Sequence, residues 1–360
     1  MIKFYNILNQ DKFLHKSIIK TFKRDIKKTN FILGEQVKSF EEDFSKFTNN
    51  KFSVGCANGT DAIYLALKAL NLPSNSEVIV PAMTWISTAL SVVNCGLKPV
   101  LADIDENSPL LSINEIIKKV TPKTKAVIPV HLYGSVFNTK ELKKRISKNI
   151  FIIEDAAQAH GGRYDDNFKI GKYSNMACYS FYPGKNLGCY GDGGLITTNS
   201  TNISKNLIKL RNMGSSSKFK FDLVGINSRL DEVQASILKI KLKKLNFLNA
   251  KRIELAKIYH KLIQNNKISK LNYSKYAVFH QYVVQVKNRS KFIKLLKKND
   301  IGYGLHFPVT INKINSFKKF FKNDNYKFSE KLSKSCISLP IDPSLKRDSI
   351  KKICNIINKY

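Results

Sequence analysis

The sequence predicts an α/β protein with a mostly parallel β-sheet, followed by a smaller α+β domain. From about residue 35, short apolar runs alternate with helical patterns, and continuously apolar strands are typical of a sheet covered on both faces. After about residue 230 a long helical pattern and an alternating strand replace this rhythm. With 360 residues the chain is long enough for two domains. We expect a large domain with an N-terminal arm over 1–240 and a small one over 241–360.

The strand-like runs follow one another through the first half of the chain. They are SEVIVPAM (76–83), KPVLADID (98–105), KAVIPVHLYG (125–134), NIFIIEDAAQ (149–158), ACYSFY (177–182) and GGLITT (193–198). Between them, INEIIKKV (113–120) and NTKELKKRIS (138–147) have the spacing of amphipathic helices. A sheet of this type binds ligands at the carboxyl ends of its strands, so we expect functional residues at that edge.

The second half of the chain begins with a helical pattern from Arg229 to Ile263, with apolar residues at i, i+3 and i+4. Its length predicts two helices, with a break near Asn246–Asn249. The run AVFHQYVVQV (277–286) then alternates like an antiparallel strand. A helix over 290–299, the run IGYGLHFPV (301–309) and an amphipathic tail complete the small domain.

The chain is strongly basic, with 61 Lys and Arg against 27 Asp and Glu and a net charge of +34. Such a charge fits a polyanionic partner such as nucleic acid. However, the positive residues are spread over many segments, and no nucleic-acid-binding signature accompanies them. The same field would attract a small anionic substrate, for example a nucleotide-linked one. We therefore expect no nucleic-acid partner.

The cysteines and the apolar runs indicate a cytoplasmic protein. None of the six cysteines forms a C-x-x-C pair or lies at metal-ligand spacing from a histidine, so we expect reduced, mostly buried thiols and no metal. No apolar run is long enough to cross a bilayer, and the first residues lack the pattern of a signal peptide. We expect no membrane partner.

The first segment with possible chemistry is CANGTDAIYLALKAL (56–70). Asn58, Gly59 and Thr60 form a turn that opens a helix. Free amides at a helix N-terminus, together with the threonine hydroxyl, make a natural phosphate site. The alternative is a simple helix cap with Asp61 in the first turn.

The second segment is IIEDAAQAHGG (152–162). Asp155 directly follows an apolar run, which places its carboxylate at a strand's carboxyl end, where ligands bind. The alternative is that Asp155 caps the next turn. Gln158 and His160, among small residues that permit close approach, favour a site.

The third segment is CYSFYPGKNLGCYGDGG (178–194), in which Lys185 has no charged neighbour for several positions on either side. Ser180 ends the preceding strand, and a turn then leads to Lys185. A lysine beside the carboxylate of Asp155 would be partly desolvated, which lowers its pKa and frees the amine for Schiff-base chemistry. The alternative is one more solvated lysine.

Together these segments meet the requirements of pyridoxal 5'-phosphate. This cofactor needs a lysine for its aldehyde, a carboxylate at its ring nitrogen and a phosphate cup. It also needs a flat residue against its ring. Trp85, the single tryptophan, follows another strand, although it could equally be a core or interface anchor.

The same segments resemble the DegT/DnrJ/EryC1/StrS family of sugar aminotransferases, which are fold-type I (aspartate aminotransferase-like) pyridoxal phosphate enzymes. The similar motifs run through most of the chain in the family's order. They are NFILGEQVKSFEEDF (30–44), ANGTDAIYLAL (57–67), VIVPAMTWISTA (78–89), PVLADID (99–105), PVHLYG (129–134), IEDAAQAHGG (153–162), SFYPGKNLGCYGDGG (180–194), GINSRLDEVQASIL (225–238) and GLHFPV (304–309).

The resemblance implies roles for individual residues around the cofactor. Lys185 forms the Schiff base and then moves the proton, Asp155 pairs with the ring nitrogen, and Gln158 contacts the side of the phenolic oxygen. The phosphate is held by Gly59, Thr60 and Ser180, and Trp85 stacks on the ring.

The resemblance also implies that a neighbouring subunit completes the site. Asn227 would reach the phosphate from that subunit, which makes the active enzyme a homodimer. Arg229 would bind the donor's carboxylate or the substrate's phosphates, with a structural ion pair as the alternative.

For the substrate, the resemblance points to members that aminate C3 of a nucleotide-linked keto sugar. Tyr182, His306 and Phe307 would lie near the sugar, and Phe307 departs from the tyrosine expected there, just as Met213 departs from a histidine. The expected reaction moves the amino group of glutamate to a dTDP-3-keto-6-deoxyhexose. Products of this type feed lipopolysaccharide and O-antigen, other glycans or antibiotics.

Several alternatives remain at this stage. The nearest is a C4 aminotransferase acting on a UDP- or GDP-4-keto sugar with the same machinery. A dehydratase of the family would have histidine in place of Lys185, so that lysine argues against it. A basic nucleic-acid-binding protein, or a regulator that binds the cofactor without catalysis, comes from another functional class.

Overall fold

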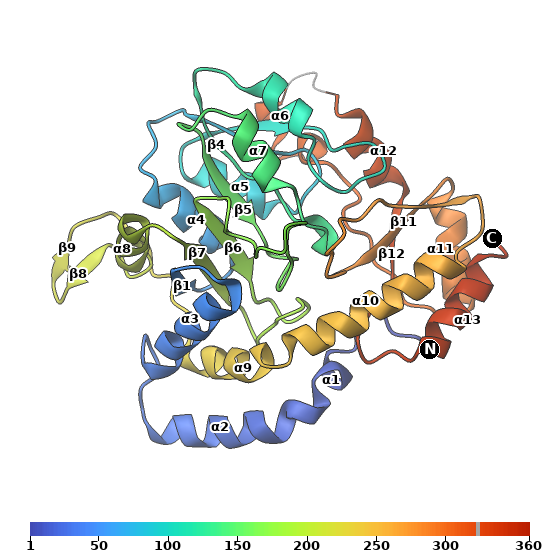
Figure 1. Ribbon diagram of the computed structural model, residues 1–360, viewed down its shortest axis with the longest axis horizontal. Helices are drawn as coiled ribbons and strands as arrows, with labels where there is room; N and C mark the ends of the chain where they lie inside the picture. The colour runs from blue at the N-terminus through green and yellow to red at the C-terminus, as the bar shows by residue number, and fades with distance from the viewer. Residues whose placement is uncertain (322–324) are drawn as a thin grey trace.

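The structure, a computed structural model, describes residues 1–321 and 325–360 and contains a central seven-stranded sheet (Figure 1). Its strand order is β1-β7-β6-β5-β4-β2-β3. The neighbouring strands β3, β2, β4, β5 and β6 are parallel to one another, whereas β7 runs antiparallel to both β6 and β1. The predicted mostly parallel sheet is therefore confirmed. The strands are β1 (Phe52–Cys56), β2 (Glu77–Pro81), β3 (Lys98–Ala102), β4 (Thr124–Val127), β5 (Phe151–Asp155), β6 (Met176–Ser180) and β7 (Gly194–Thr198).

Helices cover both faces of this sheet because its strands are apolar on both sides. In β2, Val78 and Val80 face one hydrophobic core while Ile79 faces another. The first face carries α4 (Gly59–Ala69), α5 (Ser87–Asn94) and α8 (Thr201–Leu210). The opposite face carries α3 (Glu35–Thr48), α6 (Ile113–Lys119), α7 (Thr139–Arg145) and α9 (Glu232–Leu242).

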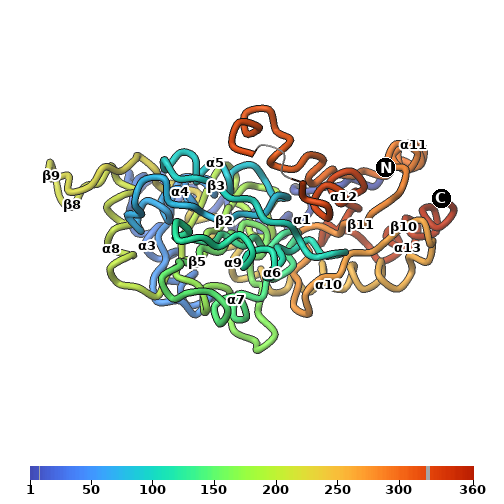
Figure 2. The backbone as a smooth tube through the Cα atoms, turned by 90° about the horizontal axis from the view of Figure 1, so that it is seen from above, coloured from blue at the N-terminus to red at the C-terminus, as the bar shows by residue number. Residues whose placement is uncertain are grey.

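A second, antiparallel sheet forms the other lobe, on the right in Figures 1 and 2. Its strands are β10 (Ile268–Lys270), β11 (Tyr282–Val286) and β12 (Cys336–Leu339). The helices of this lobe are α10 (Leu245–Leu262), α11 (Arg289–Lys298), α12 (Lys327–Ser335) and α13 (Arg347–Ile357). The long α10 runs from beneath the central sheet to this lobe (Figure 1).

The remaining elements are short or peripheral. The N-terminal arm contains α1 (Ile7–Gln10) and α2 (His15–Lys27), and a hairpin of β8 (Ser215–Ser217) and β9 (Lys220–Phe221) projects at the far edge of the molecule (Figures 1 and 2). Short 3-10 turns occur at 12–14, 132–134, 311–313 and 318–320. None of the described helices is long and apolar enough to cross a membrane.

The predicted boundary after residue 240 stays a prediction, and two segments cross it. At the N-terminus, Ile2 pairs with Ile301 of the second lobe. In the other direction, Ile311 and Phe317 pack into the core against the central sheet. The two lobes therefore exchange short segments on either side of the predicted boundary.

Two details of the predicted elements are wrong. The helix break lies between Leu242 and Leu245 and not near Asn246–Asn249, because Asn249 lies within α10 and its buried side chain is hydrogen-bonded to Asn186 and to the carbonyl of His160. The strand expected over 277–286 begins only at Tyr282. The prediction also lacked β1, whose short run FSVGC alternates small and polar residues with apolar ones. The predicted free thiols are confirmed, since all six cysteines are unpaired and five are buried.

An aromatic cluster fixes α3 against the strand that leads to the candidate site. Phe44 is fully buried, and its ring centroid lies 4.9 Å from that of Tyr179 and 5.7 Å from those of Phe40 and Phe181. Phe181 directly follows β6 and begins the loop that carries Lys185. The rings thus connect the core to that loop.

We expect Phe44→Ala to lower the free energy of unfolding by about 3–5 kcal/mol, because it removes a fully buried ring and leaves a cavity. Urea-induced unfolding followed by tryptophan fluorescence measures the change. Phe168→Ala serves as the control, since Phe168 is 42% exposed and should cost far less. Equal losses for both variants would contradict the packing described.

Candidate active site

The pairing register of four strands brings three predicted segments to one edge of the sheet. Asp155 ends β5 and Ser180 ends the neighbouring β6. Ser180 pairs with Gly194 of β7, and Gly194 pairs with Cys56 at the end of β1. The chain leaves β1 directly into α4, so the first turn of that helix lies beside Ser180. The prediction that the functional residues share the carboxyl edge agrees with this register.

Lys185 lies in a tight turn after β6. Its backbone N–H donates to the carbonyl of Tyr182 at 2.9 Å, and a side chain at Gly188 would come within 2.5 Å of the carbonyl oxygen of Pro183. The lysine side chain is half-buried. Burial lowers the pKa of Lys185 to about 8, while the negative charge of Asp155 acts in the opposite direction. A substantial fraction of this amine is therefore neutral near pH 8, as Schiff-base chemistry requires.

Asp155 is buried and is oriented by two hydrogen bonds. The hydroxyl of Thr88 in α5 donates to Oδ2 at 2.8 Å, and the N–H of Ala157 donates to Oδ1 at 3.2 Å. Burial raises the pKa of Asp155, whereas these two bonds and the charge of Lys185 oppose the rise. The bond from Ala157 is the one expected if Asp155 caps the next turn. The other carboxylate oxygen, Oδ2, is engaged separately by α5.

The first turn of α4 combines a helix cap with an anion site. The side chain of Asn58 caps the helix by accepting from the N–H of Asp61 at 2.8 Å. Among the described residues, the amides of Gly59 and Thr60 have no acceptor, and the hydroxyl of Thr60 lies 2.7 Å from that of Ser87. Unpartnered amides at a helix N-terminus are suited to a phosphate.

Close approach between α4 and β6 shapes this cup. A Cβ at Gly59 would lie only 2.6 Å from the Cβ of Ser180, so only glycine fits at this point. The residues present therefore fit pyridoxal phosphate at each end: open amides and hydroxyls for its phosphate, the oriented Asp155 for its ring nitrogen, and Lys185 for its aldehyde.

Aromatic residues from both lobes contact one another around His306 and Phe307. Trp85, 58% exposed, follows β2, and its ring centroid lies 5.5 Å from that of Phe307. His306 places Nδ1 2.8 Å from the hydroxyl of Ser338 in β12, and Phe4 stacks on its ring at 5.7 Å. Burial, with a further contribution from Lys185, lowers the pKa of His306 to about 4.

Other predicted residues occupy less direct positions. Tyr182 is 59% exposed at the mouth of the lysine turn. Gln158 is buried, and its Oε1 accepts from the N–H of Tyr133 at 2.6 Å, so one of its polar atoms is already engaged by backbone. His160 is fully buried against Tyr179 and Phe181, and burial lowers its pKa to about 3.

Asn227 and Arg229 flank Ser228, which is hydrogen-bonded to α4. The hydroxyl of Ser228, between them, donates to Asp61 at 2.6 Å and accepts from the N–H of Ala57 at 3.0 Å. Asn227 is exposed, and Arg229 donates to the side-chain oxygen of Asn212 at 3.3 Å. Within the described residues Arg229 has no carboxylate partner. The roles given to both residues stay predictions.

Sequence reasoning missed Thr88, Ser87 and Asn186. Ser87 and Thr88 follow Trp85 in the run VIVPAMTWISTA, and hydroxyls so close to a strand's carboxyl end could have identified them. Their partners, however, are 27 and 67 residues away in sequence. Asn186 directly follows Lys185, and its partners lie in the second half of the chain.

We expect the amine of Lys185 to titrate near pH 8 in cofactor-free protein, against about 10.4 for a free lysine side chain. Asp155→Asn removes the negative charge that favours the protonated amine, so the midpoint should fall below that of the wild type. Acylation of Lys185 across pH, followed by peptide mass spectrometry, gives the midpoint. A variant midpoint at or above the wild-type value would contradict the coupling.

Comparison with known proteins gives the same result as the geometry. Residues 13–358 match the model of the DegT/DnrJ/EryC1/StrS aminotransferase family. The chain is 36% identical to a dTDP-3-amino-3,6-dideoxy-alpha-D-galactopyranose transaminase of Aneurinibacillus thermoaerophilus, covering 100% of this chain and 99% of that protein. It is 34% identical to a pleiotropic regulatory protein of Geobacillus stearothermophilus, with 96% and 95% covered.

A third relative acts on a UDP-linked sugar, and one solved structure is very similar. The UDP-2-acetamido-2-deoxy-3-oxo-D-glucuronate aminotransferase of Pseudomonas aeruginosa is 34% identical, with 98% of this chain and 99% of that protein covered. The crystal structure of DesV from S. venezuelae has a TM-score of 0.96 and 33% identity, with 99% and 98% covered. The chain therefore belongs to the DegT/DnrJ/EryC1/StrS aminotransferase family, whose cofactor is pyridoxal phosphate.

Proposed function

We propose that this protein moves the amino group of L-glutamate to C3 of a nucleotide-linked keto-deoxyhexose, with dTDP-3-keto-6-deoxyhexose as the expected substrate. The observation that carries the proposal is the half-buried Lys185, with its pKa lowered to about 8, beside the buried carboxylate of Asp155. A lysine at this point supports transamination and argues against dehydration.

The choice of C3 is supported by relatives that cover nearly the whole chain. One is named for a dTDP-3-amino sugar and another for a UDP-linked 3-oxo sugar, so both names specify carbon 3 and they differ in the nucleotide. We favour dTDP because the dTDP relative has the higher identity of the two. Amination at C4 of a UDP- or GDP-linked sugar remains the main alternative.

The residues of the site divide the work of the reaction. When bound, pyridoxal phosphate supplies an electron sink for the carbon that carries the amine. Lys185 Nζ, when neutral, accepts the proton from that carbon of the donor and returns it at the other end of the transfer. The carboxylate of Asp155 would hold a proton on the ring nitrogen of the bound cofactor, and the hydrogen bond from Thr88 keeps that carboxylate oriented.

The cofactor's phosphate and the sugar nucleotide meet different surfaces. The amides of Gly59 and Thr60 would hold the cofactor's phosphate at the N-terminus of α4. Trp85 and Phe307 provide an apolar wall, and Phe307 lacks the hydroxyl that a tyrosine would offer to the sugar. The net charge of +34 raises the local concentration of a dianionic nucleotide sugar through long-range attraction.

We further propose that the active form is a homodimer in which Asn227 reaches the partner's cofactor phosphate. Asn227 is exposed, whereas Ser228 beside it is fully buried and bonded to α4, so the asparagine faces outward. The adjoining β8–β9 hairpin and its flanks expose Phe219 (85%) and Val224 (88%) at the far edge of the molecule (Figures 1 and 2). Exposed apolar groups of this kind favour a protein interface.

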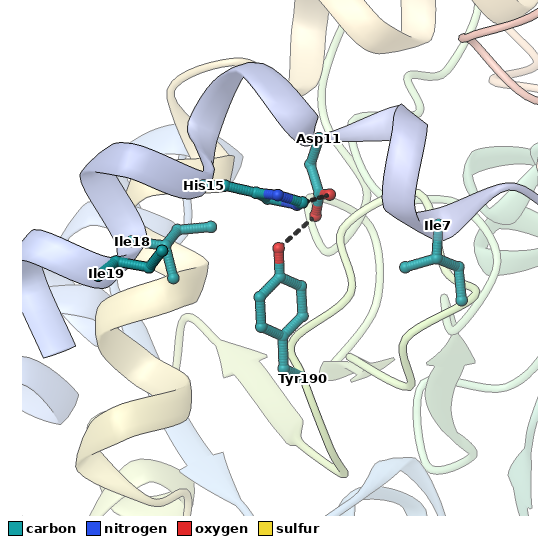
Figure 3. Close-up of a pocket in the computed structure, with 6 residues that line it drawn as sticks. All are labelled: Ile7, Asp11, His15, Ile18, Ile19 and Tyr190. Carbon is teal, nitrogen blue, oxygen red and sulfur yellow. Dashed lines mark hydrogen bonds and ion pairs between the residues drawn. The ribbon is translucent and has the colours of Figure 1, made fainter.

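The N-terminal arm carries a second apolar surface suited to the dimer contact. A cavity of about 430 Å³ lies between the arm and the loop after Lys185 (Figure 3). Three polar residues line it: Tyr190 donates to Asp11 at 2.9 Å, and His15 contacts the same carboxylate at 3.1 Å. None of the predicted site residues lines it, so we assign it to the dimer contact and not to the substrate. The apolar residues lining it are Ile7, Ile18 and Ile19.

The cytoplasmic location and the use of the product in lipopolysaccharide or O-antigen synthesis stay predictions. A non-catalytic regulatory role is the one alternative from a different class that a relative's name supports. It predicts cofactor binding without turnover, which the following experiment measures directly.

We expect purified protein supplied with cofactor to show a visible absorption band that borohydride abolishes and that Lys185→Ala lacks, because this lysine carries the cofactor. With glutamate, it should convert a dTDP-3-keto-6-deoxyhexose to the amino sugar, as detected by mass spectrometry. Turnover of UDP-4-keto sugars alone would overturn the C3 assignment. A band without turnover of any keto sugar would favour the regulatory role.

The homodimer can be tested by mixing two inactive variants. Lys185→Ala and Asn227→Ala should each have little activity, because one lacks the amine and the other weakens phosphate binding in the partner. After co-refolding, each mixed dimer has one intact site, and about one quarter of the wild-type activity should return. No recovery, despite mixed dimers seen by native mass spectrometry, would place Asn227 in its own subunit's site.

A further inference from the structure

The residue directly after Lys185 is bound by three residues from two distant segments. Asn186 is 2% exposed, and its amide donates to Oδ1 of Asn249 at 2.9 Å and to the carbonyl of Val278 at 3.0 Å. Its side-chain oxygen lies 3.2 Å from Nδ1 of His280. Asn249 belongs to α10, and the other two residues precede β11 of the second lobe.

The hydrogen bonds of this network allow only one assignment of donors and acceptors. Both hydrogens of the Asn186 amide are used, so its oxygen must accept, and His280 must carry its proton on Nδ1. Asn249 accepts from Asn186 and donates its own amide to the carbonyl of His160 at 2.8 Å. Every polar side-chain atom of the two asparagines therefore has a defined partner.

His280 remains neutral in this arrangement. It is buried, and burial lowers its pKa well below the usual range, with Lys185 as the next contributor. The other groups that act on it in the same direction are Arg252, His306 and His160. Protonation of His280 therefore does not disturb the bond to Asn186 near neutral pH.

The network connects the two polar groups of the candidate site. His160 lies in the short segment that follows Asp155, so Asn249 links that segment to the turn of Lys185. In the described residues, all other hydrogen bonds of 182–188 stay within residues 180–191. Among the residues that the structure describes, Asn186 is thus the one side chain of the turn that hydrogen-bonds it to the rest of the protein.

We propose that Asn186 is a positioning residue that holds Lys185 in its half-buried place beside Asp155. This inference rests on the proposed function only for the use that the protein makes of Lys185. The effect of Asn186 on the burial of the Lys185 amine requires neither cofactor nor substrate. If the amide of Asn186 is lost, the turn loses its attachment to α10 and to the second lobe, and the amine of Lys185 becomes more exposed to water. Because burial affects this amine more than Asp155 does, protonation should become easier.

The test measures the titration of Lys185 in cofactor-free Asn186→Ala by acylation and peptide mass spectrometry. We expect the midpoint to rise by at least one pH unit above the wild type, which corresponds to labelling about fivefold slower at pH 8. If this variant does not fold, Asn249→Ala, which removes a single acceptor from Asn186, should shift the midpoint in the same direction by less.

A matched control exists at the opposite edge of the sheet. Asn50 is buried, and its amide donates to the carbonyls of Thr48 and Ile170 while its oxygen accepts from Asn199. Asn50→Ala removes a comparable set of bonds and should lower the melting temperature without moving the Lys185 midpoint. An unchanged midpoint in the Asn186 and Asn249 variants, or an equal shift in Asn50→Ala, would overturn the inference. Absence of transamination by the wild type would overturn only the proposed function.

Discussion

The site depends on one constraint: a lysine and a carboxylate must be held close together out of water. Burial alone disfavours the charged forms of Lys185 and Asp155. The opposite charge of each group reduces the pKa shift that burial causes in the other. The protein keeps this balance by giving the carboxylate two hydrogen bonds and leaving the amine half-buried. The amine is therefore neutral enough to react, while the carboxylate keeps a fixed orientation.

The sequence predicted the segments that meet at this site because strand ends can be located from apolar runs. Asp155 and Ser180 end β5 and β6 as expected, and Gly59 begins α4. The contacts that orient these groups could not be predicted in the same way. The bond from Thr88 to Asp155 and the bonds of Asn186 join residues tens of positions apart, and only the tertiary fold brings them together.

The errors in the predicted elements have a related cause. Asparagines in a helical pattern were interpreted as a break, since they favour turns. In the folded chain Asn249 is buried, and its side chain satisfies the interior instead of its own backbone. The short strand β1 escaped notice because its burial comes from its pairing with β7 and from the core that Val54 and Cys56 join, and not from its own composition. Tertiary contacts decided both cases.

The reversed strand β7 has a consequence for how the lysine is presented. Because β6 and β7 are antiparallel neighbours, the chain between Ser180 and Gly194 leaves and re-enters the sheet at the same edge. A parallel neighbour would have required a crossover to the opposite edge, usually through a helix on one face. Lys185 is instead carried by a local connection that stays at the edge of the sheet where β5 and β6 end. Insertions or deletions in that connection would change the chemistry while leaving the order of the sheet intact.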